Sequence, residues 1–483
     1  MRALHVCAEI FPLLKTGGLA DVCGALPAAL NQLGCDTRVL VPGFPTILRG
    51  LAGREPVGSL AMLPEGASLH IGTLADGVRA YVIDAPALYG REGNPYADAG
   101  GHPYDDNHRR FALLGRVAAQ LALGLDPLWS AEVVHAHDWH AALAPAYVRA
   151  AEAQQGRRLA ATVYTVHNLA YQGVFAGYLF GELGLPAHFF SVDGLEYHGQ
   201  ISFMKGGLHF ADRITTVSPT YAREIQGPEQ GCGLDGLLRR RSAELSGILN
   251  GVDDAVWNPA QDATLPARYD AKRIAAKQDN RAALQKAFGL AAQNGAPLFG
   301  VVSRLTEQKG FNLVLAGLPE LLRLGGQLVV LGSGDAALEA ELRQAAAAAP
   351  RQVAVQIGYD EPQAHRIVAG ADVIMVPSRF EPCGLTQLYG LKYGTLPLVR
   401  RVGGLADTVV DCALENLADD SATGMVFDRF DVADFNAAVR RAVALYQRRN
   451  DWRQVQRRAM AQRFDWGAAA EQYVALYRQI GAG

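Results

Sequence analysis

The chain opens with the apolar run ALHVCAEI (residues 3–10), the loop LLKTGG (residues 13–18) and the helical stretch ADVCGALPAALNQL (residues 20–33). A short apolar run followed by an amphipathic stretch predicts a buried strand that leads into a helix. Gly17 and Gly18 would let the backbone approach a ligand closely, and free N–H groups at a helix start favour an anion. Lys15 adds a positive charge, so we expect Lys15, Gly17 and Gly18 to bind a ligand. The alternative is a plain tight turn.

The same alternation continues along the chain and starts again near residue 297. Further strands are predicted at Thr37–Val41, Val78–Ile83, Glu132–His135, Leu159–Val166, Arg213–Val217, Pro297–Ser303, Gln327–Leu331, Val353–Ile357, Val373–Val376 and Leu396–Val399. Two such series, separated by helical stretches, predict an α/β protein with two doubly wound, Rossmann-like domains facing a central cleft. The boundary falls in the Gly-, Pro- and Asp-rich stretch 225–280. We place it at residue 245, which gives domains 1–245 and 246–465.

The bulk composition excludes several classes of protein. The 483 residues exceed the size of one ordinary core, and 49% apolar with 19% charged residues is a globular composition. A formal net charge of -3 gives no reason to expect nucleic acid or an anionic membrane as a partner. The six cysteines form no C-x-x-C pair, and no apolar run approaches 18 residues. We therefore expect a cytoplasmic protein with no membrane partner.

Two cations follow the first predicted strand of the second domain. Arg304 and Lys309 stand in the run SRLTEQKG (residues 303–310), at the carboxyl end of the strand Pro297–Ser303. Cations at that place would stabilise the charge of a departing pyrophosphate. On spacing alone, surface residues that cap a helix are an equally good interpretation.

An acidic residue follows another strand of the same series. Glu381 lies in RFEPCGLT (residues 379–386), beyond the strand Val373–Val376, and a helix is expected to begin at Gly384. A carboxylate there would hold sugar hydroxyls, and the helix start would hold phosphate. The alternative role of Glu381 is to cap that helix. Cys383 has no indicated histidine partner, so we interpret it as packing or as lining the site.

The run HAHDWH (residues 135–140) raises the question of a metal. Its spacing is weak evidence, because structural or ligand-contacting histidines are commoner than metal ligands. The sequence has no Asp-x-Asp triplet of the kind that carries a divalent cation to a sugar nucleotide. We therefore expect a mechanism with no metal and no cofactor.

One short motif occurs twice. The letters GGLAD at residues 17–21 return at residues 403–407, and each copy follows a predicted strand. Either the repeat is a coincidence, or each domain presents a glycine-rich helix start to the shared cleft.

Taken together, seven motifs resemble the bacterial glycogen synthases and plant starch synthases, from Ala3 to about Tyr477. They are KTGGLADV (15–22), HDWH (137–140), TVHNLAYQG (165–173), FMKGG (203–207), ILNGVD (248–253), SRLT (303–306) and FEPCGLTQ (380–387). The resemblance implies a GT-B fold whose last helix, about Trp466–Ile480, returns to complete the first domain with residues 466–483. It also implies transfer of glucose from ADP-glucose to an α-1,4-glucan (glycogen), with retention of configuration and without a metal.

The resemblance also implies roles for individual residues. Lys15 matches the family's phosphate-binding lysine, Arg304 and Lys309 its pyrophosphate-stabilising cations, and Glu381 its carboxylate near the donor glucose. The remaining matches are His167 and Asp138 beside sugar and acceptor, and Asn250, Gly384, Leu385 and Thr386 as donor contacts. Tyr389 stands where the wider retaining GT-B group has a second glutamate, which argues against a mechanism that needs two carboxylates there.

Two other functions are open on the sequence. The first is a UDP-glucose-dependent GT-B transferase of the sucrose or trehalose type, which the KTGGLAD and CGLTQ motifs disfavour. The second is a non-catalytic glucan- or nucleotide-binding protein on the same fold. A binding module has no need to keep Lys15, Arg304, Lys309 and Glu381 together, and all four are present.

Overall fold

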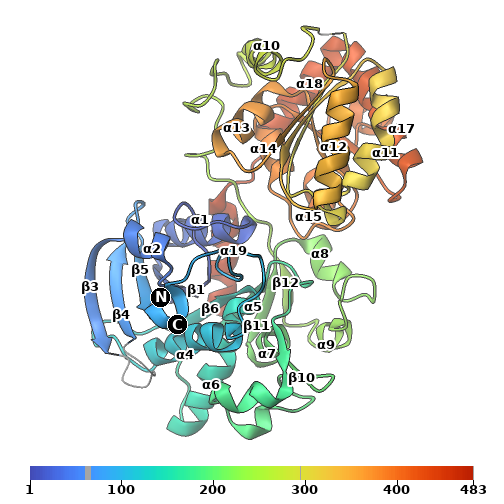
Figure 1. Ribbon diagram of the computed structural model, residues 1–483. Helices are drawn as coiled ribbons and strands as arrows, with labels where there is room; N and C mark the ends of the chain where they lie inside the picture. Colours follow the sequence, from blue (N-terminus) through green and yellow to red (C-terminus); the bar gives the residue numbers. More distant parts are fainter. Residues whose placement is uncertain (60–66, 294, 482–483) are drawn as a thin grey trace. The chain divides into compact units, whose positions relative to one another are not determined.

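The protein is described by a computed structural model that covers residues 1–59, 67–293 and 295–481 (Figure 1). The chain divides into two compact units. Unit 1 contains Met1–Gly251 and Trp466–Gly483, and unit 2 contains Val252–Asp465. The boundary expected at residue 245 falls on strand β12 (Leu245–Gly247), which pairs in parallel with β11 (Arg213–Thr216). This pairing holds the chain in unit 1 until Gly251.

Unit 1 is built on a nine-stranded sheet with the order β12-β11-β7-β6-β1-β2-β5-β4-β3. Its other strands are β1 (Arg2–Val6), β2 (Asp36–Pro42), β3 (Ala52–Ser59), β4 (Ser68–Thr73), β5 (Arg79–Asp84), β6 (Val133–His137) and β7 (Ala161–Val166). The strands from β12 to β5 are parallel, whereas β4 and β3 are antiparallel to their neighbours. The chain passes from β1 to β2 and on to the edge strand β3, returns through β4 to β5 beside β2, and then crosses to β6 on the other side of β1. The sheet therefore reverses its winding between β1 and β6.

Helices and a small second sheet complete unit 1. The helices are α1 (Gly18–Gln32), α2 (Pro45–Gly50), α3 (Pro86–Tyr89), α4 (Asn107–Ala122), α5 (Asp138–Ala141), α6 (Leu143–Gln155), α7 (Phe203–Phe210), α8 (Pro219–Glu224), α9 (Asp235–Arg240) and α19 (Trp466–Gln479). The second sheet pairs β8 (Val174–Ala176), β10 (Gln200–Ser202) and β9 (Glu196–Tyr197). In Figure 1 the red helix α19 lies beside the blue helix α1, and Leu26 and Leu30 of α1 share a core cluster with Trp466 and Tyr473 of α19.

Unit 2 is a six-stranded, fully parallel sheet with the order β15-β14-β13-β16-β17-β18. Its strands are β13 (Leu298–Val302), β14 (Gln327–Gly332), β15 (Val353–Ile357), β16 (Val373–Val376), β17 (Leu396–Arg400) and β18 (Met425–Phe427). Its helices are α10 (Lys277–Ala287), α11 (Phe311–Arg323), α12 (Ala336–Ala348), α13 (Glu361–Gly370), α14 (Thr386–Lys392), α15 (Gly403–Thr408), α16 (Leu414–Ala418), α17 (Val432–Gln447) and α18 (Arg449–Ala461). The winding of this sheet reverses between β13 and β16.

The two doubly wound sheets confirm the predicted α/β class. Two local expectations were wrong. The first strand ends at Val6 instead of Ile10, and the antiparallel strands β3 and β4 were not predicted. Among the described residues, no helix is both long and apolar enough to cross a membrane.

Candidate active site

The binding residues predicted in unit 1 follow the two strands between which the sheet reverses. Lys15 and Gly17 lie in the loop after β1, and Asp138 follows β6 directly. In open α/β sheets, ligands bind outside the carboxyl ends of the strands at such a reversal. The order of the strands therefore brings both motifs to the position where this fold binds ligands.

The loop that carries Lys15 is held by Glu9, a residue that was not predicted from the sequence. The Glu9 side chain is buried. Its Oε2 accepts the backbone N–H of Thr16 at 2.6 Å, and its Oε1 accepts the hydroxyl groups of Thr16, at 2.5 Å, and of Tyr96. Three donors around one buried carboxylate fix the loop ahead of α1. The sequence offered one signal for this role, which is an acidic residue at the end of an apolar run. A charged group that is buried requires hydrogen-bond donors around it.

The Lys15 ammonium lies beside the start of α1. Its Nζ is 2.9 Å from Oδ1 of Asp21 in the first helical turn. Gly17 immediately precedes α1, and a Cβ atom added there would meet no described atom within 4 Å. The backbone at Gly17 is therefore open to close approach, as a ligand-binding loop requires.

The second copy of the GGLAD motif serves a different purpose. A Cβ atom at Gly403 would lie 1.8 Å from the carbonyl oxygen of Glu381, and one at Gly404 would lie 2.2 Å from that of Cys383. Only glycine permits the start of α15 to pack so closely on the Glu381–Cys383 backbone. Packing therefore explains the two glycines of the second copy, and the expectation that this copy offers a helix start to a ligand stays a prediction.

Asp138 organises the segment that follows β7. Its Oδ1 accepts the backbone N–H groups of His167 and Asn168 at 2.9 and 3.2 Å. Its own backbone has a φ of 57°, a left-handed conformation that is uncommon outside glycine and typical of functional sites. Burial raises the pKa of Asp138 to about 7, although the two backbone hydrogen bonds oppose this shift. The structure thus places Asp138 and His167, both predicted site residues, in direct contact.

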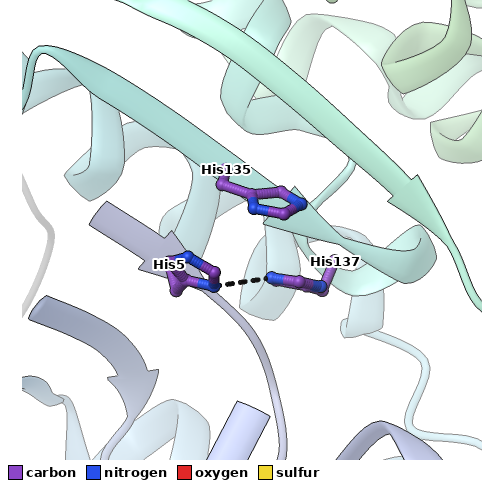
Figure 2. Close-up of side chains that lie close together, drawn as sticks. All are labelled: His5, His135 and His137. Atoms are coloured by element: carbon purple, nitrogen blue, oxygen red, sulfur yellow. Dashed lines mark hydrogen bonds between the residues drawn. The ribbon is translucent and has the colours of Figure 1, made fainter. Parts of the chain in front are cut away.

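Two of the histidines that raised the question of a metal, His135 and His137, are buried in unit 1 beside His5. Ligand atoms of His5, His135 and His137 lie within 4.8 Å of one another (Figure 2). All six of their ring nitrogens have hydrogen-bond partners: His5 and His137 bond each other, and the other partners are Tyr477, Thr165 and His167. The geometry is therefore that of a hydrogen-bonded network with no ring nitrogen left over for an ion.

In unit 2, the predicted residues again follow the two strands at the reversal. Lys309 comes after β13, and Glu381 comes after β16. Lys309 Nζ donates to Glu381 Oε2 at 2.6 Å, and Ser378 Oγ donates to the same oxygen at 2.8 Å. Arg304 is exposed, and its side chain forms no hydrogen bond or ion pair with any residue that the structure describes. The structure thus brings Lys309 and Glu381 together and leaves the Arg304 guanidinium available to an anion.

The turn after Glu381 leads into α14. This helix begins at Thr386, two residues after Gly384, where it was expected to start. Gln387 Nε2 donates to the carbonyl oxygens of Cys383 and Gly384 at 3.0 and 2.8 Å, and Gly384 has a φ of 73°. The buried Cys383 and the partly buried Leu385 complete this turn. The donor contacts expected of Gly384, Leu385 and Thr386 stay predictions.

Two further positions need comment. Asn250 is buried and lies in unit 1, three residues after β12, although the expected boundary at residue 245 placed it in the second domain. The ring of Tyr389 stacks on Trp257 with a centroid distance of 3.7 Å and an interplanar angle of 5°, and His365 stacks on Trp257 at the same distance. The position of the absent second glutamate is therefore occupied by an aromatic stack.

The arrangement in each unit suits a phosphorylated sugar ligand. Unit 1 offers Lys15 beside an open glycine loop, and unit 2 offers Arg304 and Lys309 beside the carboxylate of Glu381. Two Rossmann-like sheets with such groups at their winding reversals define a GT-B glycosyltransferase.

Comparison with known proteins specifies the family. A model of the starch synthase catalytic domain matches residues 2–240, and a model of glycosyl transferases group 1 matches residues 285–459. The chain is 64% identical to a glycogen synthase of Leptothrix cholodnii, with 100% of each chain covered, and 55% identical to one of Francisella tularensis subsp. novicida, with 99% of each covered. The protein belongs to the glycogen and starch synthase family.

Solved structures agree with this assignment. The catalytic domain of starch synthase IV from Arabidopsis thaliana, bound to ADP and acarbose, matches with a TM-score of 0.89 and 31% identity over 99% of both chains. A sucrose-phosphate synthase from Thermosynechococcus elongatus matches with a TM-score of 0.60 and 17% identity, which shows the shared fold alone.

Proposed function

We propose that the protein transfers glucose from ADP-glucose to the non-reducing 4-hydroxyl group of an α-1,4-glucan such as glycogen, with retention of configuration and release of ADP. The observation that carries the proposal is the ion pair of Lys309 and Glu381 after β13 and β16, together with Arg304 after β13, whose side chain has no partner among the described residues. It provides positive charge for a leaving diphosphate and a carboxylate for a sugar. Full-length similarity to glycogen synthases supports the same activity.

The roles of individual residues follow from this reaction. Arg304 and Lys309 stabilise the charge that develops on departing ADP. Glu381 contacts the donor glucose, and Lys15 with the Gly17–Gly18 backbone binds donor phosphate. The other donor contacts are Asn250, Cys383, Gly384, Leu385 and Thr386, while His167 and Asp138 contact the sugar and the acceptor.

The proposed chemistry needs no protein nucleophile. Retention often proceeds by double displacement, which requires a carboxylate opposite the leaving group. The stacked Tyr389 occupies the position of a second carboxylate. In the proposed step the bond between the glucose C1 and the ADP oxygen breaks, and the acceptor 4-hydroxyl attacks C1 from the same face. Its proton passes to the leaving phosphate oxygen, so that positioning and charge stabilisation carry the reaction.

The test is radiolabel transfer to a glucan primer from ADP-glucose and, separately, from UDP-glucose. We expect the label to enter the glucan from ADP-glucose with the faster turnover. Equal or faster transfer to the glucan from UDP-glucose would contradict the proposed preference for ADP-glucose, and failure of both donors to label the glucan would be the result expected of an enzyme of the sucrose or trehalose type. Binding of ADP-glucose without any transfer would favour a binding protein.

The proposal includes neither a metal nor a cofactor, because Arg304, Lys309 and Lys15 supply the positive charge. Transfer should therefore continue at its full rate after thorough treatment with a chelator. Loss of transfer that added Mn²⁺ or Mg²⁺ restores would contradict this part. A cytoplasmic location is also proposed, and the six free cysteines support it.

A further inference from the structure

A chain of buried hydrogen bonds leads from helix α19 to His167. Tyr477 Oη lies 3.2 Å from His5 Nε2, His5 Nδ1 lies 3.0 Å from His137 Nε2, and His137 Nδ1 lies 3.0 Å from His167 Nε2. We call these four residues the histidine relay; Figure 2 shows its central contact, between His5 and His137. His135 forms a branch, because its Nδ1 lies 2.6 Å from Tyr477 Oη.

The rings of the relay are neutral. Burial lowers the pKa of His5 and of His167 to about 3, and it lowers the pKa values of His135 and His137 well below the usual range. A neutral imidazole carries one N–H group and one acceptor nitrogen. Each contact between two rings therefore holds a single proton. For this reason, the nitrogen that carries the proton in one ring determines which nitrogen carries it in the next.

Only two arrangements satisfy every contact. If Tyr477 donates to His135, then His5, His137 and His167 each donate from Nε2, and His135 donates from Nε2 to Thr165. If Tyr477 donates to His5, all four rings carry their proton on Nδ1. Any mixture sets two donors or two acceptors face to face in the core, which leaves a buried polar group unpaired. All four histidines must therefore share one tautomer.

The relay ends at His167 Nδ1, which has no hydrogen-bond partner among the described residues. In the first arrangement this nitrogen is an acceptor, and in the second it is a donor. The backbone of His167 is already fixed by Asp138 at 2.9 Å. The one feature of His167 that the relay can change is thus the hydrogen bond that it offers from Nδ1.

We propose that Tyr477, His5 and His137 are positioning residues, which set as one unit the tautomer that His167 presents to a hydroxyl group of the substrate sugar. The proposal rests on the proposed function, in which His167 contacts that sugar. The chemistry of the ligand is a hydroxyl group, which can donate or accept and so can meet either arrangement.

The first test observes the protons directly. Neutron diffraction from crystals of the full-length protein grown in D₂O locates the deuterium on each ring. We expect His5, His135, His137 and His167 to carry it on the same type of nitrogen. Different types within the set, or a doubly protonated ring, would overturn the proposal. This result does not depend on any activity of the protein.

The second test is kinetic and uses Tyr477→Phe, with Tyr473→Phe as a matched control. Tyr473 is a buried tyrosine one turn earlier on α19, and its hydroxyl makes none of the bonds of the relay. Tyr477→Phe removes the hydrogen bonds of the Tyr477 hydroxyl to His5 and to His135 and should lower kcat about tenfold. The KM for glucan should stay within about twofold, since the lost hydrogen bonds are to the buried His5 and His135 and not to substrate, and Tyr473→Phe should keep its kcat.

The two tests separate the possible failures. Aligned protons with an unchanged kcat in Tyr477→Phe would overturn the link to the sugar and leave the proposed function intact. Equal losses of melting temperature and kcat in both variants would show a merely structural role and overturn the proposal. Absence of glucose transfer in the unmodified protein would overturn the proposed function, while the proton positions would still decide whether the relay exists.

Discussion

Lys309 and Arg304 follow the same strand, yet their surroundings differ. Lys309 lies 2.6 Å from a buried carboxylate oxygen of Glu381, whereas Arg304 is exposed and has no ion-pair partner among the residues described. Lys309 therefore has a structural contact as well as its proposed role in catalysis. For Arg304, only the proposed role in catalysis applies.

This difference predicts distinct effects of two substitutions. Arg304→Ala should lower kcat by roughly 10²–10³ with little change in melting temperature, because a group that stabilises developing charge typically has that effect. Lys309→Ala should lower kcat similarly and also lower the melting temperature, since it leaves the buried Glu381 carboxylate without its cation. Arg343→Ala, at an exposed arginine of α12, is the control. A near-normal kcat in both site variants would contradict the assignment.

A second prediction concerns Lys15, whose ammonium pairs with Asp21 at 2.9 Å. Lys15→Gln should raise the KM for ADP-glucose roughly 10- to 100-fold, because a charge-assisted contact contributes about 1.5–3 kcal/mol. The KM for glucan should hardly change, since the acceptor is uncharged. Asp21→Asn is the matched control: it breaks the ion pair and keeps the Lys15 charge. Equal effects of the two variants, or an unchanged donor KM in folded Lys15→Gln, would show that Lys15 only supports the turn.

At the scale of elements, a buried lysine joins α10 to two other parts of unit 2. Lys277 Nζ donates to the carbonyl oxygen of Ala369 in α13 at 2.6 Å and to Oγ1 of Thr395, just before β17, at 2.5 Å. Burial lowers the pKa of Lys277 to about 7, because the charged form is poorly solvated there. Between pH 7 and the usual lysine pKa, the unfolded chain therefore binds more protons than the folded one.

The Lys277 side chain therefore makes the free energy of unfolding rise as the pH increases above 7. The slope is at most about 1.4 kcal/mol per pH unit. Lys277→Met should lose this contribution, and Lys286→Met, at an exposed lysine of the same helix, should keep it. Urea unfolding at several pH values between 7 and 10 measures the difference in slope. Parallel profiles for the unmodified protein and Lys277→Met would contradict the lowered pKa.

The elements also show what the sequence could predict. The fully buried strand Val373–Val376 was predicted at its observed bounds, because a continuous apolar run is a strong signal. The partly buried edge strand Val353–Ile357 was also predicted at its observed bounds. Strand β3 was missed: it is an exposed edge strand with Gly53 and Pro56, so no alternation marks it. Strand β4 did carry a signal in its buried Leu69 and Ile71.

Some residues of the candidate site were likewise predicted from the sequence, and others were not. Arg304, Lys309 and Glu381 were predicted because each follows a recognisable strand, and the strand order explains their place. Glu9 was not predicted, although it ends an apolar run and two of its three donors belong to Thr16, seven residues further on. Tyr477 was not predicted either, since its role depends on contacts between distant parts of the chain. Tyr477 and His5, for example, are 472 positions apart. No local pattern records such a contact.

For the whole molecule, the important feature is that unit 1 is discontinuous and unit 2 is not. Residues 252–465 contain a complete core and should unfold cooperatively as an isolated fragment. Residues 1–251 lack α19, which leaves Leu26 and Leu30 of α1 uncovered, and each buried leucine contributes about 1.5–3 kcal/mol. Urea unfolding followed by circular dichroism should show a less stable fragment 1–251, which a peptide of residues 466–481 stabilises. Equal stability with and without the peptide would contradict this account.

The contact between α1 and α19 also has a consequence for biosynthesis. A ribosome makes α1 before any of unit 2, and it makes α19 only after all of unit 2. At about 5–20 residues per second, that interval lasts on the order of twenty to ninety seconds. During this time α19 does not cover the apolar side of α1 in the nascent chain, and His5 lacks its hydrogen bond to Tyr477. Until translation reaches α19, each new molecule is therefore exposed to aggregation. Its histidine relay is also incomplete until then.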